Sequence, residues 1–122
     1  MHHSTLLVAS AALIQGALSA KISTFAGPHC TGAQKDIHVY DDTSVLNIPQ
    51  FQSYRENGYG SHGQRVAFYT ESGLPGTCGG AKIYDTWAYD GDYFHSHQCY
   101  NLIDHEPHKY GVASCVTSYY KL

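Results

Sequence analysis

Apolar and polar residues alternate over short segments of this chain, with the period of two that is typical of half-buried β-strands. We expect a strand wherever such a run lies between turn residues. The expected strands are residues 21–25, 37–40, 51–55, 65–70, 83–89, 93–100 and 112–120. No long window repeats apolar residues at helical spacing, and Gly and Pro recur from Gly27 onward. The pattern predicts an all-β protein, a small antiparallel β-sandwich.

Two Asn-Gly or Asp-Gly pairs predict tight turns. Asp90 and Gly91 lie between the expected strands 83–89 and 93–100, and Asn57 and Gly58 follow strand 51–55. Both pairs tolerate the positive φ of a type I′ hairpin turn. We therefore expect strands 83–89 and 93–100 to form a hairpin.

The N-terminal segment has the pattern of a secretory signal peptide. Residues 6–18 form an apolar run too short to span a bilayer, and small residues follow it up to Ala20. We expect a signal peptide at residues 1–20 and one secreted, extracellular β domain at residues 21–122. No second apolar stretch approaches membrane length, so we expect no membrane span.

Charge and composition narrow the classes of partner. Seven Lys and Arg against ten Asp and Glu give a formal net charge of −3, which disfavours nucleic acid as a partner. Eleven Tyr, four Phe and one Trp supply apolar area with polar tips, suited to half-buried strands and binding surfaces. We expect a monomer whose partner is an extracellular protein or glycan.

A short pattern occurs twice, and it resembles a known repeat. Phe25 is followed by Cys30 and Gly32 at the same spacing with which Tyr69 is followed by Leu74 and Gly76. The spacing of an aromatic, four residues, an apolar residue, one residue and Gly resembles the repeat of the βγ-crystallin superfamily. That resemblance implies two Greek-key repeats, each with a later serine. It also connects the chain with small secreted microbial members, among them killer-toxin-like proteins and a metalloproteinase inhibitor.

The later serines of these two repeats would be Ser53 and Ser114. They lie at unequal distances from their aromatic residues. The calcium signature of the family is not matched at residues 41–46, so the resemblance does not extend to calcium binding.

The four cysteines, Cys30, Cys78, Cys99 and Cys115, predict two disulfides in a secreted domain of this size. Three pairings are possible. We expect Cys30–Cys78, because both lie near the corners of the two repeats, and Cys99–Cys115, because one loop separates their strands. With its signal peptide, size and Tyr and Gly content, the chain resembles fungal small secreted cysteine-rich proteins. Members of that class are often effectors or antimicrobial proteins, so the resemblance implies such a role.

An aromatic cluster around residue 90 is the candidate binding surface. It contains Tyr84, Trp87, Tyr89, Tyr93, Phe94 and Tyr100, with His95 and His97 beside it. Alternation would place Trp87 and Tyr89 on one face with Ile83 and Asp85. Such a face can stack on sugar rings or anchor a protein partner, and the alternative is ordinary core packing.

Histidines offer a second hypothesis, a metal site. On a strand, His95 and His97 would project to one face about 7 Å apart. His105 and His108 could add ligands from the next loop, and imidazole ligands suit Zn²⁺ or Cu²⁺. The alternative, which we favour, is a set of histidines without metal, so we expect no cofactor.

A third hypothesis is a small secreted hydrolase. Glu56 adjoins Arg55, and residues 107–110, which include His108, resemble a stretch of the secreted fungal ribonucleases. The N-terminal cysteine pattern and the helix of that family are missing. We therefore expect a non-enzymatic binding protein, an effector or toxin-like antimicrobial, with the ribonuclease-like and metal-binding proteins as alternatives.

Overall fold

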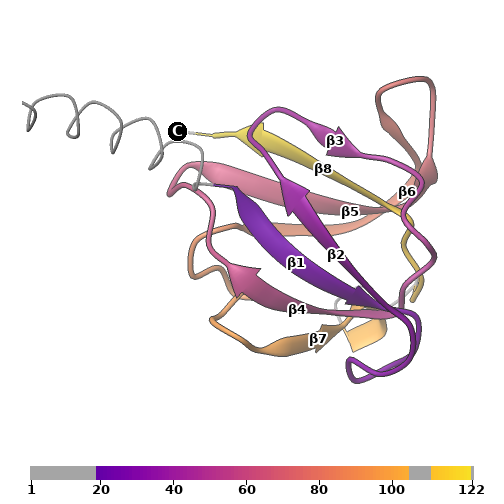
Figure 1. The fold of residues 1–122 in the computed structure, drawn as a ribbon. Coiled ribbons are helices and arrows are strands. Elements are labelled where there is room, and N and C mark those ends of the chain that lie inside the picture. The colour runs from indigo at the N-terminus through magenta and orange to yellow at the C-terminus, as the bar shows by residue number, and fades with distance from the viewer. Residues whose placement is uncertain (1–18, 105–110, 122) are drawn as a thin grey trace, which may run out of the picture.

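Two four-stranded antiparallel sheets make up the computed structural model, which describes residues 19–104 and 111–121 (Figure 1). The strands are β1 (Ala20–Phe25), β2 (Gln34–Val39), β3 (Ser44–Val45), β4 (Ser53–Gly58), β5 (Gln64–Ser72), β6 (Cys78–Trp87), β7 (Cys99–Asn101) and β8 (Cys115–Tyr120), with one 3-10 turn, η1 (Leu102–Asp104). The predicted all-β antiparallel fold with two disulfides is confirmed.

The order of the strands carries an internal repeat. One sheet has the order β2-β1-β4-β7, and the other has the order β3-β8-β5-β6. Each half of the chain therefore builds three strands of its own sheet and gives its third strand, β3 or β7, to the other sheet. This exchange ties the two halves together, because neither sheet is complete without a strand from the other half.

Alternating side chains of the two sheets meet in a core of aromatic and aliphatic residues. In β5, Val66 and Phe68 are both fully buried, as the alternating pattern requires. Tyr54 of β4 crosses from the opposite sheet and stacks on Phe68, with ring centroids 4.5 Å apart. Phe51 and Tyr84 also pack against Phe68. Aromatic packing between the sheets thus contributes area burial and ring–ring contact.

The two repeated segments form the turns between β1 and β2 and between β5 and β6. Gly32 and Gly76, which end the two copies of the pattern, both have positive φ, +86° and +84°. Ser53 donates a 2.6 Å hydrogen bond to the carbonyl of Gly27 in the first turn. Ser114 donates a 2.9 Å hydrogen bond to the carbonyl of Thr70 near the second. Both candidate serines therefore tie a later strand to the hairpin of their own half.

The predicted disulfide pairing is wrong. The bonds are Cys30–Cys99 and Cys78–Cys115. Because β7 pairs with β4 in the first sheet, Cys99 lies next to the β1–β2 turn that holds Cys30. Cys78 and Cys115 both lie opposite β5, in β6 and β8. Each disulfide thus stays within one sheet, and the exchanged strand β7 makes the Cys30–Cys99 bond possible.

Both predicted hairpin turns are also wrong. Asn57 and Gly58 are the last two residues of β4 rather than a turn. Strand β6 pairs with β5, and no pairing joins it to residues 93–100, of which only the last two belong to a strand, β7. The Asp90 and Gly91 turn therefore begins a connection from one sheet to the other. Asp90 does have the positive φ, +53°, that its residue type tolerates.

The expected signal peptide falls largely outside the described residues. Ser19 and Ala20 are buried, and Ala20 is the first residue of β1, where it pairs with Val39. No described helix is long and apolar enough to cross a membrane.

Candidate functional site

The predicted aromatic cluster divides into a buried part and an exposed part. Trp87, Tyr89 and Tyr93 expose 38%, 42% and 37% of their surface, and we call these three side chains the aromatic surface. Tyr84, which we expected in the binding surface, is buried against Tyr54 and Phe68. The reason is the alternation along β6, which turns Tyr84 toward the core and Trp87 away from it.

Trp87 is held in place by charged neighbours on β5 and β6. The guanidinium of Arg65 lies 4.5 Å from the centre of the Trp87 ring. Arg65 is also paired with Asp85, which accepts hydrogen bonds from Lys82 and Tyr119. Burial raises the pKa of Asp85, but the bonds from Lys82, Tyr119 and Arg65 outweigh it and lower that pKa to about 2. Asp85 is therefore ionised at neutral pH and fixes the cation that packs on Trp87.

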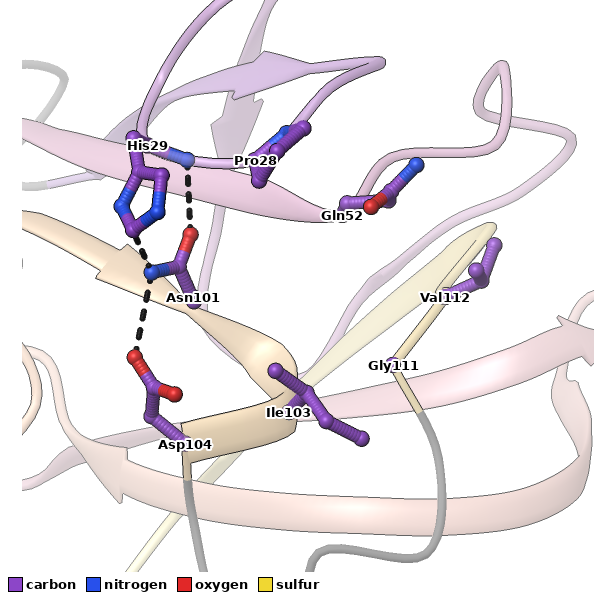
Figure 2. A pocket seen from close by; sticks show the side chains of 8 residues that line it. All are labelled: Pro28, His29, Gln52, Asn101, Ile103, Asp104, Gly111 and Val112. Carbon is purple, nitrogen blue, oxygen red and sulfur yellow. Dashed lines mark hydrogen bonds between the residues drawn. The ribbon is translucent and has the colours of Figure 1, made fainter.

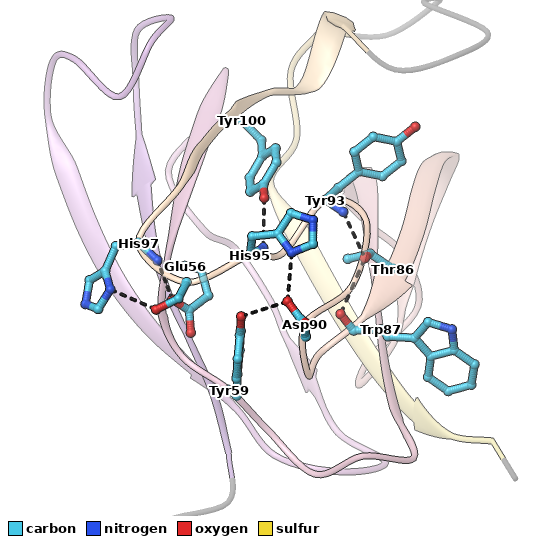
Figure 3. Close-up of polar contacts among 10 residues, drawn as sticks. Glu56, Tyr59, Thr86, Trp87, Asp90, Tyr93, His95, His97 and Tyr100 are labelled. Atoms are coloured by element: carbon cyan, nitrogen blue, oxygen red, sulfur yellow. Dashed lines mark hydrogen bonds and ion pairs between the residues drawn. The ribbon is translucent and has the colours of Figure 1, made fainter.

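Thr86 connects Trp87 with Tyr93. Its hydroxyl accepts from the backbone N–H of Tyr93 and donates to the carbonyl of Trp87, each at 3.4 Å (Figure 3). Gly91 packs against the same group, since a Cβ at this position would collide with Thr86 Oγ1 and the Trp87 carbonyl. The connection from β6 is therefore folded closely back on the end of its own strand.

A bond from the core fixes Tyr93. The hydroxyl of Tyr54 donates a 2.8 Å hydrogen bond to the carbonyl of Tyr93. Burial is the main cause that raises the pKa of Tyr54 well above its usual range, and the nearby Tyr100 and Tyr93 add to it. The Tyr54 hydroxyl therefore stays protonated and remains a donor. The Tyr93 ring packs edge-on against the rings of Tyr84 and Tyr100, with distances between ring centroids of 5.2 Å and 6.4 Å. One side of the ring is thus supported, and more than a third of its surface stays open.

Tyr89 has aromatic support of its own. It lies 4.8 Å from Tyr59 and stacks on the His62 ring at 3.8 Å, measured between ring centres. The Tyr59 hydroxyl donates to Asp90 at 3.2 Å. Asp90 also pairs with Nδ1 of His95 at 2.8 Å, and the bonds from His95 and then Tyr59 lower the pKa of this carboxyl (Figure 3). The aromatic surface is therefore bordered by a polar Tyr59–Asp90–His95 group.

His95 and His97 do not share a strand face, so that expectation is wrong. Both lie outside β7, and His97 is in a turn with a φ of +59°. The ring of His95 faces Asp90, whereas the ring of His97 is bonded to Ser96. Figure 3 shows His97 on the other side of the connection from Trp87 and Tyr93.

The described part of the chain contains no cluster of side chains of the kind that the metal hypothesis requires. There, no three or more His, Cys, Asp or Glu side chains are grouped so that they could hold a metal ion. His105 and His108 lie outside the described residues.

Glu56, the candidate acid of the hydrolase hypothesis, is buried and bonded to the backbone. It is 3% exposed, and its carboxylate accepts a 2.8 Å hydrogen bond from the backbone N–H of His97. Arg55, its neighbour, lies over the ring of Phe25 at 5.2 Å rather than beside Glu56. Glu56 thus supports the turn before β7, and its proposed partner His108 lies outside the described residues.

A pocket at the other end of the sandwich was not predicted. It has a volume of about 440 Å³ and is lined by Pro28, His29, Gln52, Asn101, Ile103, Asp104, Gly111 and Val112 (Figure 2). Its residues come from the β1–β2 turn, from the residue before β4, from the end of β7 with η1, and from residues 111–112. Sequence reasoning missed it because four segments far apart in the chain meet there.

Comparison with known proteins identifies no relative. No family model matches the sequence, and no curated protein or solved structure is significantly similar to it.

Proposed function

We propose that this chain is a secreted, non-enzymatic binding protein that acts outside the producing cell by attaching to a protein through the aromatic surface. The observation that carries the proposal is the exposure of Trp87, Tyr89 and Tyr93, each between 37% and 42%, on a disulfide-bonded sandwich. Trp, Tyr and Arg are the residue types that most often dominate binding energy at protein interfaces. The chain places Arg65 directly on Trp87.

Preorganisation supports the same proposal. The Trp87 ring is held by Arg65, the Tyr89 ring by Tyr59, and the Tyr93 ring by Tyr84 and Tyr100. Side chains that are already fixed lose little conformational entropy on binding, so more of their contact energy appears as affinity. The two disulfides are compatible with an extracellular protein.

Within this proposal, the biological class is an effector or toxin-like antimicrobial of the kind found among small secreted cysteine-rich proteins. We also keep the βγ-crystallin resemblance as a proposal about the fold. The bonds of Ser53 and Ser114, the later serines of the two repeats, to their hairpins support it.

The experiment is a binding assay on intact cells. The oxidised protein, residues 21–122 with a fluorescent label, is titrated onto bacterial, fungal and plant cells. Trp87→Ala and Tyr93→Ala are compared with Tyr40→Ala and Tyr120→Ala, because Tyr40 and Tyr120 are even more exposed, at 52% and 49%, and lie outside the aromatic surface. We expect saturable binding of the parent protein. The affinity should fall at least tenfold in Trp87→Ala and Tyr93→Ala and stay unchanged in the two controls.

Treatment of the cells identifies the class of partner. Prior digestion with protease should remove the binding sites. Binding that survives protease but disappears after periodate oxidation would show a glycan instead. Equal binding by all four variants would contradict a role for the aromatic surface.

A further inference from the structure

We infer that the pocket of about 440 Å³ between the β1–β2 turn and η1 is a binding site for a neutral saccharide. The volume falls within the range of natural small-ligand sites, about 300–1,000 Å³. This site would be additional to the aromatic surface through which we propose that the protein acts. Figure 1 places the connection after β6 and the β1–β2 turn at opposite ends of the sandwich. None of the three side chains of the aromatic surface is among the described residues that line the pocket.

The polar wall of this pocket is preorganised around Asn101. Its Oδ1 accepts a 2.7 Å bond from the backbone N–H of His29, and its Nδ2 donates at 3.0 Å to Asp104 (Figure 2). These two partners fix the orientation of the amide. Nδ2 therefore also faces Nδ1 of His29, at 3.0 Å. Nδ1 must then be an acceptor, which leaves the ring proton on Nε2 as a donor.

The backbone that presents His29 is held by several bonds. His29 and Cys30 both have a φ of +56°, although neither is glycine. This turn is held by the disulfide to Cys99, by the Ser53 hydroxyl and by Asn101. Several independent bonds therefore enforce its shape. Strained residues of this kind persist where the surrounding structure enforces them, and they occur preferentially at ligand sites.

The chemistry of the lining selects the ligand. The Asp104 carboxylate accepts hydrogen bonds, the amide of Gln52 offers both donors and an acceptor, and Pro28, Ile103 and Val112 add apolar surface. Hydroxyl groups of a sugar both donate and accept, so they match this mixed set, and its C–H faces match the apolar side. The described lining contains one carboxylate and neither Lys nor Arg, which disfavours an anionic ligand.

Side-chain amide signals provide the test. The ¹⁵N-labelled oxidised protein is titrated separately with glucose, mannose, galactose and N-acetylglucosamine at millimolar concentrations, and the NH₂ signals of Asn101 and Gln52 are followed by NMR. We expect saturable shifts at both amides with at least one sugar. Asp104→Asn should weaken that affinity about tenfold, the effect of losing one charged hydrogen bond. Asp92→Asn, a control at an exposed residue outside the pocket, should leave it unchanged.

The result that would overturn the inference is the absence of saturable shifts at these amides with all four sugars, or an affinity that Asp104→Asn leaves unchanged. The indole signal of Trp87, the single tryptophan, reports the aromatic surface in the same spectra. We expect it to stay constant while the pocket fills. Sugar-dependent shifts at Trp87 alone would place saccharide binding at the aromatic surface and overturn the pocket as its site.

Discussion

The hydroxyl of Tyr54, buried between the two sheets, donates a 2.8 Å hydrogen bond to the backbone carbonyl of Tyr93. This bond links the centre of the core to the connection that carries the aromatic surface. Because Tyr54 also stacks on Phe68, its position is set by the packing of both sheets. The backbone that carries the exposed ring of Tyr93 is therefore positioned from the inside of the protein.

Tyr54→Phe should loosen this connection without opening a large cavity. Only the hydroxyl is removed, so the Tyr93 carbonyl loses its partner and the free energy of unfolding should fall by about 1–3 kcal/mol. Urea denaturation measures the loss. Hydrogen exchange at the Phe94 amide, which is bonded to the Gly91 carbonyl, should accelerate. Tyr120→Phe, at a 49% exposed position, is the control, and an unchanged Phe94 exchange rate in Tyr54→Phe would refute the link.

Acid stability should depend on Asp85. Its pKa is about 2 in the folded protein against 3.8 in the unfolded chain. The lowered pKa therefore stabilises the protein above about pH 4, and this contribution is lost as the pH falls through about 2. The difference corresponds to about 2 kcal/mol. Asp85→Asn should lower stability by about that amount at pH 7 and flatten its dependence between pH 4 and 2.

The control for this prediction is Asp92→Asn, which changes an exposed carboxyl on the connection after β6. Thermal melts at several pH values measure both variants. If Asp85→Asn were as stable as the parent at pH 7 and lost stability equally on acidification, the Arg65–Asp85–Lys82 group would have no energetic role.

The disulfide pairing can be checked directly by mass spectrometry of a non-reduced digest. We expect peptides that join Cys30 to Cys99 and Cys78 to Cys115. Replacing Cys30 and Cys99 together by Ala should cost about 2–5 kcal/mol of stability, as is usual for native disulfides of small secreted domains. Peptides that join Cys30 to Cys78 would show that the exchange of β7 is wrong.

Gly91→Ala tests how closely the connection packs on β6. Its Cβ would collide with Thr86 and with backbone of Trp87, which cannot rotate away, so we expect a loss of about 1–3 kcal/mol. Gly111→Ala is the matched control, because its Cβ would meet Ile103 at an ordinary contact distance of 3.4 Å. Equal stability of both variants in urea would show that the connection has room at Gly91.

Local patterns were sufficient to predict most strands, because alternation depends on near neighbours. Val66 and Phe68 mark β5 in this way, and the exposed positions of Trp87, Tyr89 and Tyr93 lie in the predicted segment. Strand β7 has only three residues, which is too short for an alternating pattern, so its pairing with β4 could not be predicted. The wrong disulfides and the wrong hairpin both follow from that one missed pairing.

Site geometry was less predictable than strand position. The bond between Tyr54 and Tyr93 joins residues 39 positions apart, and nothing in the sequence around either one indicates it. Likewise, His29 and Asn101 are 72 residues apart, and the pocket they share exists only after the sheets have formed. Alternation places Tyr84 and Trp87 on opposite faces of β6, but it does not show which of the two faces the other sheet covers.

The most direct test of the proposed function compares Trp87→Ala with Tyr120→Ala in the binding of the labelled, oxidised protein to cells. The two variants each remove one exposed aromatic side chain, so they differ mainly in whether the aromatic surface is intact. We predict at least a tenfold loss of affinity for Trp87→Ala and no change for Tyr120→Ala, with both proteins fully folded. Equal affinities of the two variants would contradict the account.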